Sequence, residues 1–467
     1  MQDRIPTGIE GLDLILTGGF LRGQAVLLEG APGTGKTTLG VQFIHAGAAR
    51  HDEAGLIITF EQLPAQLYRE AAQFGWDLPA LEAADKLRVV CTSPQVLRDQ
   101  LHGSDSVVDD WIRQTGARRL LIDSLSHLAA LDRDPNEQRL LVVGLLNALK
   151  QRGLTVVATR EVGPQGEASL PFAGYVADTV IQVGRVAGRR YLEVLKTRGQ
   201  EHVAGRHPFR FGPEGIAVFP PPQVPDAPAP DAEAPLVSTG VAGLDHLLDG
   251  GLRRGASLLL GGESGTGKTI LGVQFLLEGI QRGEPGLLCL SHETPASVER
   301  TAASFGWDLA RPRAEGKLDV LEAPFATTCL AEHLWRIQEH LRRGGIRRVV
   351  FDSLSAMLHE VSHAPHLLRE RVDQLVRLTR GQGATALFIS ELPGGSGQSS
   401  AYGVAEPLAD AVVLLRSRRE GTRRRRGIEV LKARGVNHVL GERRMRITPA
   451  GIQVFYRPTA GAEQEDA

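Results

Sequence analysis

Short runs of apolar residues, each bounded by glycine or a polar residue, recur along this chain. Residues 25–29 form one such run, and the apolar positions that follow keep a helical spacing through Leu39, Val41 and Phe43. Strands that alternate with helical segments are typical of α/β domains. The pattern therefore predicts an α/β fold with a mostly parallel central sheet and helices on both faces.

Two further runs are continuous and end in an aspartate. Residues 118–123 read Arg-Arg-Leu-Leu-Ile-Asp, and residues 347–352 read Arg-Arg-Val-Val-Phe-Asp. Strands that are buried on both faces of a parallel sheet have this composition. Open α/β sheets bind ligands at the carboxyl ends of such strands, so we expect Asp123 and Asp352 beside a ligand.

The whole pattern occurs twice, in the same order and at offsets of 229 to 236 residues. The matched segments are 7–13 with 239–245, 40–43 with 272–275, 74–78 with 305–309, 122–126 with 351–355, and 199–202 with 435–438. A period this long is too great for a solenoid repeat, so it indicates two copies of one domain.

A proline-rich segment separates the two copies. Seven prolines fall between positions 220 and 235, which predicts a stiff, extended linker. The expected organisation is a first domain at 1–218, a linker at 219–235, a second domain at 236–456 and a disordered tail at 457–467.

Composition excludes several classes of protein. The 53 basic and 54 acidic residues give a net charge of −1, which argues against a protein that coats a polyanion. The three cysteines form no CxxC pair, which fits a reducing compartment. The sequence shows neither a signal peptide nor an apolar run long enough for a membrane span. We therefore expect a cytoplasmic protein that is not inserted in a membrane.

Each predicted first strand is followed by G-x-x-x-x-G-K-T, which opens a helix. This context distinguishes a P-loop, whose backbone N–H groups and lysine bind the phosphates of ATP, from a chance glycine-rich turn. The predicted nucleotide-binding residues are Gly30, Gly33, Thr34, Gly35, Lys36, Thr37 and Thr38, and Gly262, Gly265, Thr266, Gly267, Lys268, Thr269 and Ile270. Thr37 with Asp123, and Thr269 with Asp352, are the predicted Mg²⁺ ligands, the aspartates mostly through water.

Hydrolysis also needs a carboxylate that orients or deprotonates water. The strand that begins at residue 56 ends at Glu61-Gln62, and its counterpart ends at His292-Glu293. Each copy thus has one carboxylate, at different positions of the pair. Glu61, His292 and Glu293 are the catalytic candidates, and a solvated acid at the end of a strand is the simpler alternative.

A final pair of motifs, K-x-R-G-x-x-H, follows a strand in each copy. A solvated charged face would explain one occurrence, but two at equivalent places favour a site, and arginines often clamp phosphates in NTPases. The candidate residues are Lys196, Arg198 and His202 in the first copy and Lys432, Arg434 and His438 in the second.

Together these motifs resemble the RecA-like ATPases and, within them, the KaiC family of tandem-domain ATPases. The resemblance covers roughly residues 4–218 and 236–456 and includes T-G-x-x-G-L-D, both P-loops, F-G-W-D-L and K-x-R-G-x-x-H. It implies two tandem RecA-like P-loop domains that bind ATP and Mg²⁺. It also implies a homohexamer of two stacked rings, in which the K-x-R-G-x-x-H residues act on ATP bound by the neighbouring subunit.

The sequence departs from the family where autophosphorylation is expected. Clock members of the family phosphorylate a Ser-Thr pair shortly before a strand of the second domain, and alignment puts Glu406 and Pro407 there. Ser396, Ser399 and Ser400 lie upstream as substitute acceptors, although a Gly/Ser loop explains them more simply. We therefore expect a signalling or timing ATPase whose Ser/Thr autokinase activity is weak or lost.

Two other classes of function remain open. A RecA-type recombinase or helicase needs a DNA path, and 423–426 is the one strong basic run. We interpret that run as an exposed hairpin tip and expect no DNA partner. The other class is a non-enzymatic, nucleotide-gated scaffold that binds signalling proteins.

Overall fold

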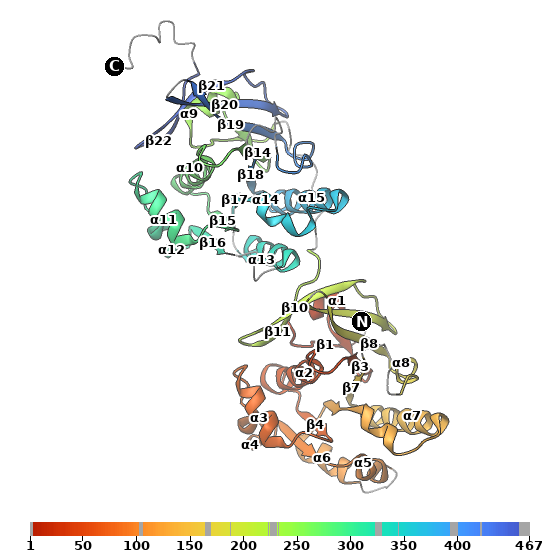
Figure 1. Cartoon of the computed structure of the whole chain (residues 1–467). Helices are drawn as coiled ribbons and strands as arrows, with labels where there is room; N and C mark the ends of the chain where they lie inside the picture. Colours follow the sequence, from red (N-terminus) through yellow and green to blue (C-terminus); the bar gives the residue numbers. More distant parts are fainter. Residues whose placement is uncertain are drawn as a thin grey trace. The chain divides into compact units, whose positions relative to one another are not determined.

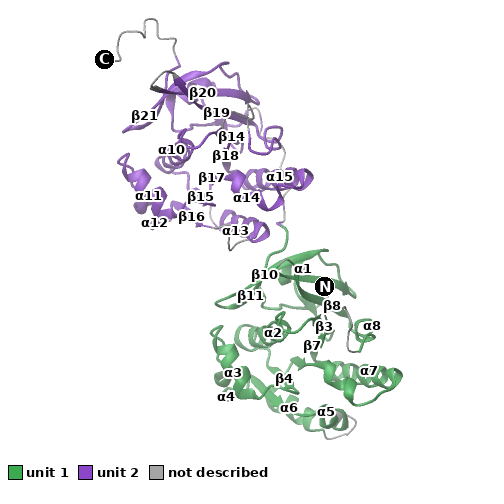
Figure 2. Cartoon of the chain, viewed as in Figure 1, with its two compact units in different colours: residues 1–221 green, residues 222–467 purple. Residues whose placement is uncertain are grey.

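The computed structural model describes residues 3–101, 106–163, 170–186, 188–222, 224, 231, 233–322, 329–343, 345–392, 400–420 and 423–456. The chain divides into two compact units, residues 1–221 and 222–467 (Figure 1, Figure 2). Each unit contains one copy of the repeat and one nine-stranded sheet. The predicted α/β class with two tandem domains is confirmed, whereas the limits predicted for the linker and the tail stay predictions.

The sheet of the first unit is parallel where the apolar runs lie and antiparallel at one end. In spatial order the strands are β11 (Gly215–Val218), β10 (Arg206–Gly212), β9 (Arg189–Thr197), β8 (Thr179–Val186), β3 (Ala25–Gly30), β7 (Thr155–Glu161), β6 (Arg119–Asp123), β4 (Gly55–Thr59) and β5 (Leu87–Cys91). The strands from β8 to β5 pair in parallel, and β9, β10 and β11 continue the sheet as antiparallel strands. β3 is therefore central, and the loop that follows it opens at the carboxyl edge.

Helices cover both faces of this sheet. One apolar cluster joins the sheet to α1 (Leu12–Ile15), α2 (Lys36–Arg50), α3 (Pro64–Ala72) and α4 (Leu78–Ala83). A second cluster joins the other face to α5 (Pro94–Leu101), α6 (Val107–Thr115), η1 (Leu125–Ala130), α7 (Pro135–Gln151) and α8 (Ala173–Val176). A small sheet of β1 (Arg4–Ile5) and β2 (Phe20–Leu21) completes the unit.

The second unit repeats this architecture. Its strands are β22 (Gly451–Val454), β21 (Arg443–Thr448), β20 (Arg423–Ala433), β19 (Ala411–Glu420), β14 (Ser257–Gly262), β18 (Thr385–Glu391), β17 (Arg348–Asp352), β15 (Gly286–Leu290) and β16 (Leu318–Glu322). The helices are α9 (Ala242–Leu247), α10 (Lys268–Gln281), α11 (Pro295–Ala303) and α12 (Ala310–Ala314), then α13 (Leu330–Arg343), α14 (Leu354–Met357), η2 (His359–Val361) and α15 (Pro365–Gly381). The small sheet is β12 (Leu236–Val237) with β13 (Leu252–Arg253).

A buried arginine joins the P-loop helix to the aspartate-bearing strand in each unit. Arg119 begins β6 and is fully buried, and its guanidinium donates to the Phe43 carbonyl of α2 and to the Glu53 carboxylate. Its carbon Cζ lies 4.6 Å from the centre of the Phe43 ring, a cation–π distance. Arg348 makes the equivalent contacts with Phe275 and Glu284. These contacts tie the two elements of each ligand site together.

Across the described part of the chain, no helix has the length and apolar character that crossing a bilayer requires.

Candidate functional site

The first glycine-rich loop connects the central strand β3 to α2. Gly35 has a φ of 113°, a conformation that side chains oppose, and α2 begins immediately afterwards at Lys36. A Cβ added to Gly30 would lie 2.0 Å from the Val183 carbonyl oxygen, so only glycine fits there. The Lys36 Nζ donates to the carbonyls of Gly30 and Ala31 at 2.9 and 3.0 Å. Burial lowers the pKa of Lys36 from its ordinary value.

The second loop has the same construction between β14 and α10. Gly267 has a φ of 106°, and Lys268 begins the helix. The Lys268 Nζ donates to the carbonyls of Gly262 and Glu263 at 2.9 and 2.8 Å. Both loops thus place a lysine ammonium against backbone at the amino terminus of a long helix, which is the arrangement that binds phosphates.

Each predicted Mg²⁺ pair meets in space. The Thr37 hydroxyl donates to Oδ2 of Asp123 at 2.7 Å, and Thr269 donates to Asp352 at the same distance. A hydroxyl and one carboxylate leave most of the coordination sphere to water and phosphate, which suits Mg²⁺. Among the described residues, no group of three or more His, Cys, Asp or Glu side chains could form a richer metal site.

The two aspartates differ in their surroundings. Asp123 also accepts a hydrogen bond from the Thr159 hydroxyl, whereas Ile389 occupies the corresponding position beside Asp352. Burial raises the pKa of Asp352 to about 6. A divalent cation beside that carboxylate would favour its charged form.

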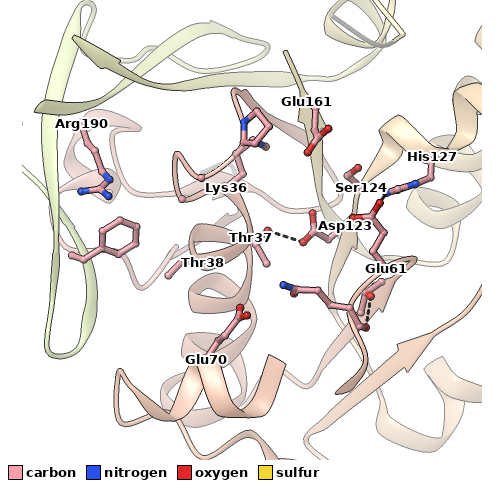
Figure 3. A pocket seen from close by; sticks show the side chains of 16 residues that line it. Lys36, Thr37, Thr38, Glu61, Glu70, Asp123, Ser124, His127, Glu161 and Arg190 are labelled. Atoms are coloured by element: carbon pink, nitrogen blue, oxygen red, sulfur yellow. Dashed lines mark hydrogen bonds and ion pairs between the residues drawn. The ribbon is translucent and has the colours of Figure 1, made fainter. Parts of the chain in front are cut away.

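The first cavity has a volume of about 370 Å³ and lies over the loop (Figure 3). The predicted residues that line it are Gly33, Gly35, Lys36, Thr37, Thr38, Glu61 and Asp123. The second cavity measures about 270 Å³, and Gly265, Gly267, Lys268, Thr269, Ile270, His292, Glu293 and Asp352 line it. The predicted nucleotide, metal and catalytic residues of each copy therefore gather at one edge of its sheet.

The carboxylates of the two cavities have different partners. Glu61 follows β4, its side chain is 75% exposed, and its Oε1 lies 3.3 Å from Nε2 of His127. In the second unit, the Ser297 hydroxyl donates to Oε2 of Glu293 at 3.3 Å.

Sequence reasoning missed several residues that line the two cavities. Glu161 ends β7 and Glu391 ends β18, and each lines the cavity of its own copy. Comparison of the two copies could have identified this pair. The carbon Cζ of Arg190 on β9 (Figure 3) lies 4.7 Å from the centre of the Phe211 ring on β10, and both residues line the first cavity. They come from antiparallel strands whose position depends on tertiary pairing.

The K-x-R-G-x-x-H residues lie outside both cavity linings as described. Lys196 donates to the carbonyls of Gly174 and Ala177, and Arg198 donates to that of Tyr175. In the second unit, Lys432 donates to the carbonyls of Glu406 and Ala409, and Arg434 donates to that of Pro407. His202 and His438 are half-buried in the loops that follow. The chain therefore does not bring these six residues to its own P-loops.

The region of the expected phosphorylation sites is only partly described. Glu406 and Pro407 precede β19, and the buried Ser400 donates its hydroxyl to Oε2 of Glu406 at 2.7 Å. Ser396 and Ser399 lie outside the described residues.

The basic run at 423–426 lies in β20, which pairs with β19 as far as Arg423 opposite Glu420. Arg424 and Arg425 are exposed, which agrees with the interpretation as a hairpin. Nearby, Arg416 pairs with Glu429 and Arg418 pairs with Glu442.

A strand, a glycine-rich loop, a helix that opens with Lys-Thr and an aspartate that faces this threonine define a P-loop NTPase, here present twice in one chain. The model of the KaiC ATPase family matches residues 5–223 and 237–459. The chain belongs to this family, and its two domains are RecA-like.

Named relatives agree with this assignment. The "Circadian clock oscillator protein KaiC" of Parasynechococcus marenigrum (strain WH8102) is 30% identical over 470 residues, which cover 97% of this chain and 90% of the relative. The protein of the same name from Parathermosynechococcus lividus is 31% identical over 464 residues, which cover 96% and 84%. The resemblance inferred from the motifs is confirmed.

Proposed function

We propose that each copy binds Mg²⁺·ATP and that the chain hydrolyses it. The observation that carries this proposal is the pairing of Thr37 with Asp123, and of Thr269 with Asp352, beside a lysine held inside its loop. The loop glycines, Lys36 and Lys268 would bind the phosphates. The two Thr-Asp pairs would hold Mg²⁺, which neutralises charge on the phosphate oxygens when it is bound.

The first copy would carry most of the hydrolysis, with Glu61 as the base. Water attacks the γ-phosphorus, a new O–P bond forms, and the bond to the bridging oxygen breaks. The ADP oxygen keeps the electron pair of that bond, and Glu61 takes the proton from the water. In the second copy Glu293 is the only carboxylate of the pair, and His292 stands where Glu61 stands in the first.

The proposed assembly is a nucleotide-dependent homohexamer of two stacked rings. Family membership supports it, and so does the placement of Lys196, Arg198, Lys432 and Arg434 away from the cavities of their own chain. In such a ring Lys196, Arg198 and His202 would act on a neighbour's ATP in one layer, and Lys432, Arg434 and His438 in the other.

The proposed role is that of a regulatory ATPase of signalling or timing type with signalling proteins as partners. Ser/Thr autokinase activity would be weak or lost because Glu406 and Pro407 stand at the acceptor positions. The ion pairs of Arg416 and Arg418 support the hairpin interpretation over a DNA path.

Steady-state ATPase measurements on Lys36→Ala, Lys268→Ala and the double variant test this function. The double variant should have no turnover, and the loss should be larger for Lys36→Ala than for Lys268→Ala. Sizing with and without Mg²⁺·ATP tests the ring. Intact nucleotide binding with no turnover in the parent chain would favour the nucleotide-gated scaffold instead.

A further inference from the structure

To act on one particular water molecule, the Glu61 carboxylate must be held in one orientation by a neighbouring side chain. Its backbone is well anchored, since the Thr59 hydroxyl donates to the Gln62 carbonyl at 2.7 Å. Its side chain, however, is 75% exposed. An exposed glutamate samples several rotamers, and holding it in one of them costs conformational entropy.

His127 is placed to supply that support. The 3₁₀ helix η1 follows β6 and carries His127 into the lining of the cavity, where its Nε2 lies 3.3 Å from Oε1 of Glu61 (Figure 3). The Phe60 ring packs against the imidazole in an edge-to-face arrangement, with ring centres 5.9 Å apart. The imidazole is therefore held between a fixed aromatic ring and the carboxylate.

The second copy provides an internal comparison, because both members of the contact change together. His292 occupies the position of Glu61, and Ala356 occupies the position of His127. The carboxylate there is Glu293, one residue later, and its described partner is the Ser297 hydroxyl of α11. In each copy, the one carboxylate of the Glu61-Gln62 or His292-Glu293 pair thus has a polar side chain from another element as its partner. This is the pattern expected if the carboxylate must be oriented.

We propose that His127 is a positioning residue for Glu61: its imidazole holds the carboxylate toward the water that attacks ATP in the first site. The inference rests on the proposed function, because it assigns Glu61 as the base. In this role His127, which lines the cavity, would act through Glu61 rather than on the nucleotide itself. Orientation of this kind contributes to the chemical step rather than to the affinity for ATP.

The test uses the full chain with Lys268→Ala, so that turnover reports the first site. His127→Ala should lower kcat about tenfold and leave KM for ATP within about twofold. His127→Gln should recover part of kcat, because its amide N–H can still reach the carboxylate. His51→Ala, an exposed histidine after α2, is the matched control and should leave turnover unchanged.

A double-mutant cycle with Glu61→Gln separates positioning from a general structural effect. Once Glu61 is removed, His127→Ala should cause no further loss of kcat. The proposal is overturned if His127→Ala leaves kcat unchanged, if it raises KM alone, or if its effect persists in full on Glu61→Gln. If Glu61→Gln itself keeps full turnover, the assignment of the base fails instead, which is a different result.

Discussion

The Thr37 hydroxyl and the Asp123 carboxylate lie 2.7 Å apart although 86 residues separate them in the sequence. Thr37 is the second residue of α2, and Asp123 ends β6, which lies two places from β3 in the sheet. The same contact between Thr269 and Asp352 occurs in the second unit. The two oxygens of each contact are the proposed Mg²⁺ ligands, so the fold brings the two proposed ligands of each copy together from distant parts of the sequence.

Removal of the Thr37 hydroxyl should weaken the use of Mg²⁺ without removing the phosphate loop. In the Lys268→Ala chain, we expect Thr37→Val to raise the Mg²⁺ concentration for half-maximal turnover about tenfold, because one ligand is lost. A Mg²⁺ titration of ATPase rate measures this. Binding of ATP in the absence of Mg²⁺ is the control and should match the parent. An unchanged Mg²⁺ requirement would remove Thr37 from the metal site.

The two copies should contribute unequally to turnover. Glu61→Gln should abolish most of the ATPase rate while ATP still binds, because the first site loses its proposed base. Glu293→Gln, the matched change in the second copy, should cause the smaller loss. Steady-state rates and a fluorescent nucleotide binding assay measure both effects. Complete loss with Lys268→Ala combined with full activity of Lys36→Ala would reverse the division of labour.

The elements at the carboxyl edge of each sheet could be predicted from the sequence, because short-range sequence patterns specify them. Continuous apolar strands, a glycine-rich loop and a terminal aspartate are each encoded by a few consecutive residues, and Lys36, Thr37 and Asp123 all line the first cavity. Arg190 and Phe211 could not be predicted in this way. They reach the cavity through the antiparallel pairing of β8, β9 and β10, which no local pattern specifies. The position of His127 beside Glu61 could not be predicted either, because it depends on how η1 turns after β6.

A buried histidine should make the second unit sensitive to acid. Burial and then the nearby Arg336 lower the pKa of His333 on α13 to about 4. An unfolded histidine titrates near 6.5, so the unfolded chain gains a proton first as the pH falls. The stability that neutral His333 contributes is fully present above pH 6.5 and is lost as the pH falls toward 4. Between pH 7 and pH 5 the free energy of unfolding should fall by ~2 kcal/mol for this reason.

His333→Gln should remove this pH-dependent part of the stability. Denaturant unfolding followed by circular dichroism at pH 7 and pH 5 measures the free energy of unfolding of both chains. The variant should be less stable than the parent at pH 7 because a buried packing group changes, yet should lose less between the two pH values. An equal loss in both chains would assign the acid sensitivity to other groups.

The assembly can be tested by complementation between two inactive chains. All chains carry Lys268→Ala; one adds Lys36→Ala and the other adds Arg198→Ala. If Arg198 acts on a neighbour's ATP, each chain alone should be inactive. A mixed ring should recover about a quarter of the first-ring sites, since an intact P-loop must lie beside an intact Arg198.

Sizing should give a species of six times 50.3 kDa with Mg²⁺·ATP. A strict monomer, or a mixture without activity, would contradict the ring.

The expected phosphorylation positions are a further place where the proposed function can be tested. Glu406 stands at a predicted acceptor position, where a glutamate carboxylate supplies one negative charge and a phosphoserine would supply about −1.5 to −2. The Ser400 hydroxyl donates to that carboxylate, and Lys432 donates to the Glu406 carbonyl. We therefore expect Glu406 to hold this segment in a state that resembles the phosphorylated one. Phosphate transfer to the second domain should be weak or absent.

Incubation with labelled ATP followed by mass spectrometry measures this. Any phosphate on the parent chain should lie on Ser396, Ser399 or Ser400 and should be substoichiometric. The double change Glu406→Ser with Pro407→Thr introduces two hydroxyls at these positions. We expect the double variant to gain phosphate, and this gain should require ATP and Lys268. Adding Glu293→Gln to the same chain is the control for the base. Stoichiometric phosphate on the second domain of the parent would mean that another hydroxyl has replaced the usual acceptors. A double variant that stays blank would mean that more than the acceptor has been lost, and the His292-Glu293 pair would then be the first place to examine.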